Sequence, residues 1–150
     1  MNPTLADLVK KKQSQSVAEP IDWSARLVKY LDAVDGLYRQ IETAFQEAIA
    51  AGSVRIHKRP RAITERYIGS YSATDLILII GQEQVQFVPR GRVFAGTEGR
   101  VDVIGERAEA MIVFLPGSGW GIVEARQPTL RTTPFTESTF AELLREIMGD

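Results

Sequence analysis

The chain has 150 residues, of which 44% are hydrophobic and 25% charged, a composition typical of an ordinary globular domain. Eighteen basic and nineteen acidic residues give a net charge of -1, so no overall positive field favours nucleic acid or lipid. The lack of cysteine and the single histidine, His57, exclude a disulfide framework, a thiol nucleophile and a Cys- or His-rich metal centre.

Residues 1–20 are predicted to form a tail that precedes one α+β domain over residues 21–150. Thr4 can cap a short helix that places Leu5, Leu8 and Val9 on one face. The polar stretch that follows, from Lys10 to Ser16, has the composition of a linker. Two interpretations remain: a frayed tail, or a docking segment on a flexible tether.

A long helix is predicted from Asp22 to Ala51. Such a helix would be roughly 45 Å long, whereas the whole domain should measure only about 40 Å. We therefore expect either a kink near Asp35 and Gly36 or an apolar stripe that extends past the sheet and meets a partner. The stripe follows heptad-like spacing through Leu27, Leu31, Val34, Tyr38, Ile41, Phe45 and Ala48.

After Gly52 the pattern changes to short strands that are separated by turns. Pro60 and Pro89 are expected to end strands, because proline cannot donate to a sheet ladder. Short turns without crossover helices favour an antiparallel meander of about six to seven strands. The predicted strands are Val54–Lys58, Ala62–Tyr71, Asp75–Ile80, Gln84–Val88, Arg100–Ile104, Ala110–Leu115, Trp120–Arg126 and Thr129–Thr133.

A C-terminal helix is predicted after Thr136, which can act as its N-cap. The sequence thus predicts an α+β fold in which the meander curls over the long N-terminal helix, as a roll or an α/β sandwich. The residues expected to be buried are Leu78, Ile80, Phe87, Val103, Val113, Phe114 and Trp120, with Phe45 and Leu144 packing on them from the helices.

The densest positive cluster lies between Arg55 and Arg66. Basic residues beside aromatic ones could bind phosphates and stack on bases. Strand alternation, however, would divide the cluster between two faces, and charge on an edge strand also protects against aggregation. The candidate contacts are Arg55, Lys58, Arg59 and Arg61, for a nucleic acid or an acidic protein.

A second candidate lies in the glycine-rich segment from Arg90 to Arg100. Arg90, Arg92 and Arg100 could hold an anion over backbone amides. Hairpin glycines with positive φ explain the same segment more simply. Because no helix is predicted to follow, the segment does not match a phosphate-binding loop.

No catalytic group, metal or cofactor is expected. Ser118 lies in a turn that lacks the strand and helix of a nucleophile elbow, and His57 is the only imidazole that could serve as its base. The carboxylates show no spacing that would bring two of them together.

We therefore expect a non-enzymatic accessory, adaptor or immunity-type protein of the bacterial cytoplasm, bound to another protein as a homodimer or heterocomplex. The alternatives are a nucleic-acid-associated module that uses the Arg55–Arg66 cluster, and a roll-fold small-ligand binder or enzyme. The expected protein contacts are Leu5, Leu8 and Val9 in the tail and Leu27, Leu31, Val34 and Tyr38 in the long helix.

Overall fold

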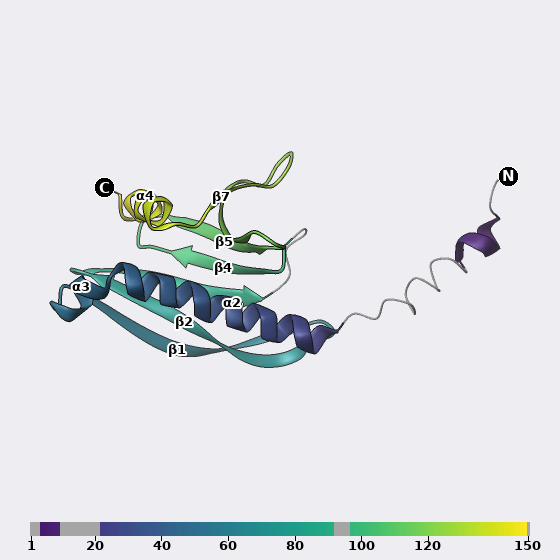
Figure 1. The fold of residues 1–150 in the computed structure, drawn as a ribbon, viewed down its shortest axis with the longest axis horizontal. Helices are drawn as coiled ribbons and strands as arrows, with labels where there is room; N and C mark the ends of the chain where they lie inside the picture. The colour runs from purple at the N-terminus through teal and green to yellow at the C-terminus, as the bar shows by residue number, and fades with distance from the viewer. Residues whose placement is uncertain (1–3, 10–21, 92–96, 150) are drawn as a thin grey trace.

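Every strand of the sheet pairs with its neighbours in sequence. The computed structural model describes residues 4–9, 22–91 and 97–149 and contains one seven-stranded antiparallel sheet in the order β1 to β7 (Figure 1). This confirms the predicted α+β fold with a meander between two helices. The elements are α2 (Trp23–Ala44), α3 (Gln46–Ala50), β1 (Val54–Glu65), β2 (Gly69–Ile80), β3 (Glu83–Gly91), β4 (Gly99–Ile104), β5 (Glu109–Leu115), β6 (Gly119–Ala125), β7 (Arg131–Pro134) and α4 (Glu137–Met148).

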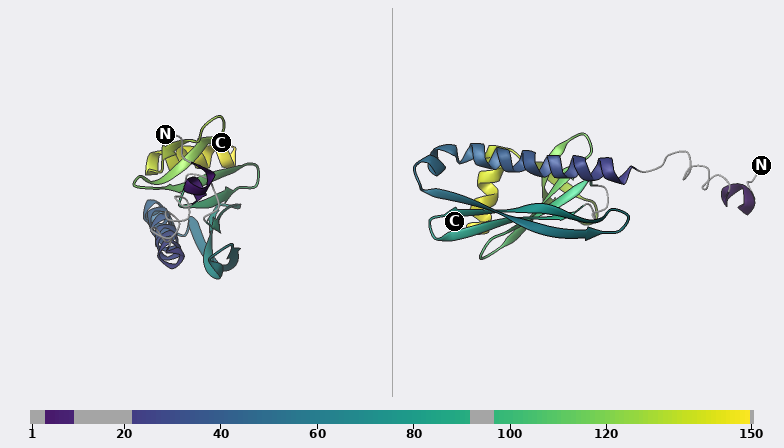
Figure 2. Two further views of the ribbon diagram at one scale, coloured as in Figure 1. Left: turned by 90° about the vertical axis from the view of Figure 1, so that its right-hand side faces the viewer. Right: turned by 90° about the horizontal axis from the view of Figure 1, so that it is seen from below.

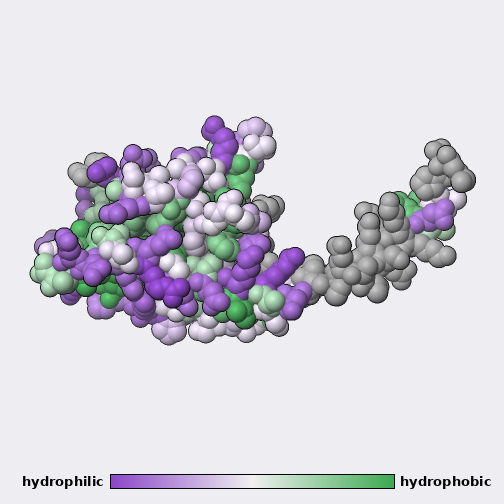
Figure 3. All heavy atoms as spheres, in the orientation of Figure 1, coloured by the Kyte–Doolittle hydropathy of each residue, from purple (hydrophilic) through white to green (hydrophobic). Residues whose placement is uncertain are grey.

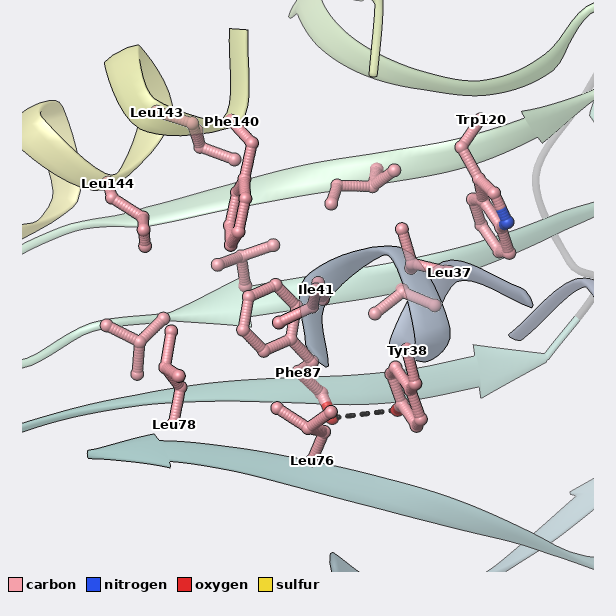
Figure 4. Packing of buried hydrophobic residues seen from close by; sticks show 14 of the residues in the cluster. Leu37, Tyr38, Ile41, Leu76, Leu78, Phe87, Trp120, Phe140, Leu143 and Leu144 are labelled. Carbon is pink, nitrogen blue, oxygen red and sulfur yellow. Dashed lines mark hydrogen bonds between the residues drawn. The ribbon is translucent and has the colours of Figure 1, made fainter. Parts of the chain in front are cut away.

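The core lies between the sheet and the two long helices. The strongly twisted sheet curls beside α2, and α4 packs against the same face (Figures 1 and 2). Phe87 lies near the centre of the core. Its ring meets the Phe140 ring edge-on, at 6.0 Å between centroids, and lies beside Ile41 of α2 (Figure 4). Most of the residues that the sequence places in the core are buried, whereas Ile80, Phe114 and Phe45 are half-buried at its margin.

The long helix is divided at Phe45, not at the predicted kink. Asp22 caps its start by accepting a hydrogen bond from the Ala25 amide, and α2 continues unbroken through Gly36. At Phe45 the backbone leaves helical geometry, with φ −104° and ψ 12°, before the short helix α3 begins. The buried face of α2 holds its central turns straight on the sheet; it consists of Tyr30, Val34, Leu37, Tyr38 and Ile41.

Neither proline ends its strand. Pro60 lies inside β1 opposite Thr74, and the strand continues to Glu65. Because β1 is an edge strand, it needs hydrogen bonds on one side only, so a residue without N–H is tolerated. The two predicted strands after Pro60 are therefore rearranged: β1 turns back at Tyr67, which has φ 72°, into the long strand β2. Similarly, β3 runs through Pro89 to a register shift before Gly91.

Two tyrosine side chains fix α2 to the sheet. The Tyr38 hydroxyl donates to the carbonyls of Thr74 and Phe87, at 2.5 and 3.2 Å. The Tyr30 hydroxyl donates to the Arg100 carbonyl at 2.7 Å and accepts from the Gly91 amide at 3.1 Å. Burial raises the pKa of both tyrosines well above the ordinary value, so both hydroxyls keep their protons and remain donors.

Candidate functional site

The N-terminal turn, residues 4–9, exposes a small apolar surface. Thr4 and Asp7 cap it reciprocally, because each side chain accepts a hydrogen bond from the other residue's amide, both at 3.2 Å. The side chains at the three apolar positions remain uncovered, with exposures of 81% for Leu5, 47% for Leu8 and 63% for Val9. Figure 3 shows hydrophobic surface, in green, at this turn. The predicted short helix therefore forms with an exposed apolar face.

The apolar stripe of α2 is mostly part of the core. Val34 and Tyr38, which the sequence assigned to partner binding, are only 2% exposed and face the sheet. This corrects their assignment, because a stripe that follows helical spacing can equally cover a sheet. Leu27 and Leu31 are half-buried, and Val28 beside them is 57% exposed. The first turns of α2 thus present apolar surface to solvent.

An open apolar groove lies where α2 ends. It encloses about 530 Å³ between the end of α2, the helix α4 and the end of β2. Its apolar lining includes Phe45, Ile80 and Met148. The charged residues that line it are Glu83, Arg107, Glu137 and Arg145. The groove has the volume of a small-ligand pocket and the lining that an apolar ligand requires. Sequence reasoning missed it because the lining comes from distant segments.

The predicted basic cluster is divided between two faces of β1. Lys58 lies toward the helices, where its ammonium pairs with Glu42 of α2 at 2.7 Å. Arg59 and Arg61 instead meet Asp75 on the outer face, by which we mean the face of the sheet opposite α2 and α4. Arg55 and His57 are exposed on β1. The cluster therefore forms no single patch, as strand alternation predicted.

Asp75 is a buried carboxylate on this outer face. Its side chain is only 1% exposed. Arg61 donates to both its oxygens, from Nε at 2.7 Å and from Nη2 at 3.0 Å, and Arg59 donates from Nη2 at 3.2 Å. The hydrogen bonds to Asp75 raise the pKa of Arg61 above its usual value, which is already high. This guanidinium is therefore charged at any working pH.

A second aspartate repeats the arrangement two strands away. Asp102 of β4 accepts from Arg100 at 2.7 and 3.0 Å and from Arg90 at 3.0 Å. The register places it opposite Val88 of β3, and the pairing between β2 and β3 makes Val88 the neighbour of Asp75. Both aspartates thus lie in one row across the sheet. The third predicted anion contact of this segment, Arg92, lies outside the described residues.

An aromatic stack joins the start of α2 to the β1–β2 hairpin, and sequence reasoning did not find it. The rings of Trp23 and Tyr67 lie 5.4 Å apart at an interplanar angle of 14°. Arg26 lies over the Trp23 ring at 5.7 Å and Arg66 over the Tyr67 ring at 5.0 Å. Tyr67 is nevertheless 68% exposed. Residues 44 positions apart in sequence carry no local signal of such a contact.

Within the described ranges, no three His, Asp or Glu side chains are grouped to hold a metal ion. None of the helices described there combines the length and apolarity needed to cross a membrane.

In comparisons with known proteins, no family model, curated protein or solved structure matches the chain. Function must therefore be argued from the sites above.

Proposed function

We propose that the chain is a non-enzymatic accessory protein that binds another protein through its N-terminal turn. The observation that supports this most is the joint exposure of Leu5, Leu8 and Val9 on one capped turn of helix. A helix this short is not stable in water without tertiary contacts. Helix-in-groove recognition supplies such contacts, because apolar residues three and four positions apart enter a groove on the partner.

The partner of this segment is a folded protein with an apolar groove. Residues 10–22 separate the turn from the first residue of α2, and a chain of this length permits docking at a distance from the sheet. Leu27, Val28 and Leu31 at the start of α2 provide a second apolar contact. We retain the bacterial cytoplasm as the proposed location, because the chain is rich in arginine and alanine, as proteins from GC-rich bacterial genomes are, and contains no cysteine.

The decisive experiment compares a docking variant with a matched surface variant. Replacing Leu5, Leu8 and Val9 by serine removes the apolar face without touching the core. Ile49→Ser is the control, because Ile49 is an exposed apolar residue elsewhere, at 37%. We expect wild type and the control to retain a host protein that the triple variant does not retain. In a direct titration, this host protein should bind purified wild type and the purified control, and should not bind the triple variant.

Self-association is a separate outcome of the same comparison. A dimer that light scattering detects for wild type and not for the triple variant would identify a second copy as the partner. If the triple variant behaves like wild type in both assays, the N-terminal turn is not a docking segment and the proposal fails.

The groove beside α4 favours a second candidate function, binding of a small apolar ligand with a negatively charged end. Much of its lining is apolar, and Arg107 and Arg145, which line it together with Glu83 and Glu137, can pair with a carboxylate. An alkyl carboxylate should raise the thermal midpoint of wild type and raise that of Arg107→Gln less. An equal shift in both proteins, or no shift, would contradict this candidate.

A further inference from the structure

The chain carries both halves of a helix-in-groove contact. The N-terminal turn leaves the side chains of Leu5, Leu8 and Val9 largely exposed, so its apolar face is not covered by the domain. The groove beside α4 is also open, with an apolar lining and a volume of about 530 Å³. Contacts of this kind join apolar residues three and four positions apart on a helix to an apolar groove. Each surface therefore has the chemistry that the other one requires.

The groove follows from the break between α2 and α3. Phe45 lies half-buried at this break, and its ring meets the Phe140 ring of α4 edge-on, at 5.9 Å between centroids. Ala141 and Met148 of α4 line the same groove and are half-buried. The charges of the two glutamates and two arginines that line it cancel. An apolar segment thus suits the groove better than a free ion does, because no net charge there compensates an ion for its lost hydration.

The length of the connecting chain bears on whether the turn can reach the groove of its own molecule. The groove lies at the end of α2, and Figure 1 shows α4 there, at the opposite end of the domain from the start of α2. To return, the thirteen residues 10–22 would have to follow the whole of α2, which is roughly 33 Å long. Thirteen residues span at most about 45 Å when fully extended, whereas an unstructured chain of that length averages roughly 20 Å end to end. Binding in its own groove would thus need a strongly stretched connection.

A second copy of the chain removes this restriction. Its groove can approach the start of α2, where Leu27, Val28 and Leu31 add apolar surface. The net charge of -1 opposes association of two copies only weakly. When each copy places its turn in the groove of the other, the two contacts close a symmetric dimer. The second contact then forms within one complex, so the two small contacts together bind more tightly than either alone.

We propose that the groove beside α4 receives the N-terminal turn of a second copy, in a dimer that exchanges both turns. This inference rests on the proposed function, because it takes the turn as a docking segment and names this same chain as the partner. The three apolar side chains of the turn enter between α4 and the end of α2. The alkyl carboxylate considered above would compete with them for the same place.

The test mixes two variants that each lack one half of the contact. The turn variant is Leu5→Ser/Leu8→Ser/Val9→Ser, and the groove variant is Ala141→Glu, which places a charged side chain in the lining. Light scattering between about 1 and 300 µM should show wild type doubling in mass, and each variant alone staying monomeric. An equimolar mixture of the two should form a heterodimer, because one intact turn and one intact groove remain.

The matched control is Ser138→Glu, which adds the same charge to α4 at an exposed position away from the residues that line the groove. It should dimerise as wild type does. Ala44→Glu, at an exposed position of α2 in the lining, should act like the groove variant without disturbing the core. The mixed pair keeps one of two contacts, so its dissociation constant should be at least about tenfold higher than that of wild type. Thermal midpoints verify that every variant is folded.

Three results would overturn the proposal. The first is a wild type that stays monomeric over the whole concentration range. If the turn variant still loses a host protein in that case, the docking function stands and only the partner assigned here is wrong. The second is a dimer that both groove variants retain, because the interface then lies elsewhere. The third is an alkyl carboxylate that raises the thermal midpoint of wild type and leaves the dimer intact, because the groove would then hold that ligand in place of the turn.

Discussion

The indole of Trp120 donates a hydrogen bond from Nε1 to the backbone carbonyl of Ala33, at 2.9 Å. The bond joins β6 to the middle of α2 across 87 residues of sequence. It is needed because the Trp120 side chain is almost fully buried, and an indole N–H without a partner there would be costly. This hydrogen bond thus fixes the position of α2 relative to β6, a strand that is distant from it in sequence.

Trp120→Phe should therefore destabilise the protein by about 2 kcal/mol, because the Ala33 carbonyl loses its indole donor and the smaller ring leaves a gap. Trp23→Phe, at the half-buried start of α2, is the comparison and should cost less. Urea unfolding followed by circular dichroism measures both. Equal losses would mean that the indole bond does not contribute measurably.

Two phenylalanines on either side of Phe140 should respond differently to truncation. Phe87 is fully buried, so Phe87→Ala should cost about 4 kcal/mol. Phe45 also contacts the Phe140 ring but lies half-buried at the groove, so Phe45→Ala should cost only about 2 kcal/mol. Denaturant midpoints measure the two losses. A larger loss for Phe45 would mean that the groove is closed in solution.

The two arginines on Asp75 should also be unequal. Arg61→Ala removes both bonds of the bidentate pair and leaves a buried carboxylate with Arg59 alone, so we expect a loss of about 3 kcal/mol. Arg59→Ala leaves that bidentate pair intact and should cost about 1 kcal/mol or less. Thermal and urea unfolding measure both. The reverse order would contradict the assignment of Arg61 as the principal partner.

Alkaline pH should expose the buried tyrosines. The pKa of Tyr30 and Tyr38 is raised in the folded chain, chiefly by burial, so above about pH 10 the unfolded chain loses protons that the folded chain keeps. Stability therefore falls as pH rises, by about 1.4 kcal/mol per pH unit for each tyrosine, and is unaffected by these groups well below pH 10.

Tyr38→Phe isolates one of the two contributions. The variant should be less stable at neutral pH, since the bond to the Thr74 carbonyl is lost, but its stability should fall less steeply in alkali. Urea unfolding at a series of pH values from about 8 to 11 gives both slopes. Parallel curves for wild type and variant would show that Tyr38 does not titrate on unfolding.

The sequence predicted the order of the elements because helical and strand periodicity are local signals. It misplaced β1 because the effect of Pro60 depends on whether its strand is central or at an edge, which only the assembled sheet decides. It missed the break between α2 and α3 for a related reason, although the predicted end of the helical region at Ala51 agrees with the end of α3 at Ala50. Phe45 fits helical spacing, and nothing local shows that the backbone leaves helical geometry there.

The same distinction between local signals and the assembled sheet applies to the candidate sites. The exposed face of Leu5, Leu8 and Val9 follows from spacing alone, whereas the burial of Val34 and Tyr38 depends on how far the sheet reaches along α2. Alternation correctly separates Lys58 from its neighbours. The pairing of arginines with Asp75 and Asp102 needs the register of four strands, and the Trp23–Tyr67 stack needs the length of the hairpin.

The unbroken β1-to-β7 order also has a consequence for how the chain folds. Each hairpin closes a short loop, so the sheet can grow by successive local steps with little loss of chain entropy. The contacts of Tyr30, Tyr38 and Trp120 with distant backbone carbonyls can form only once the sheet exists. Docking of α2 is therefore the step with the highest contact order, and substitutions along its buried face should change the rate of unfolding more than the rate of folding.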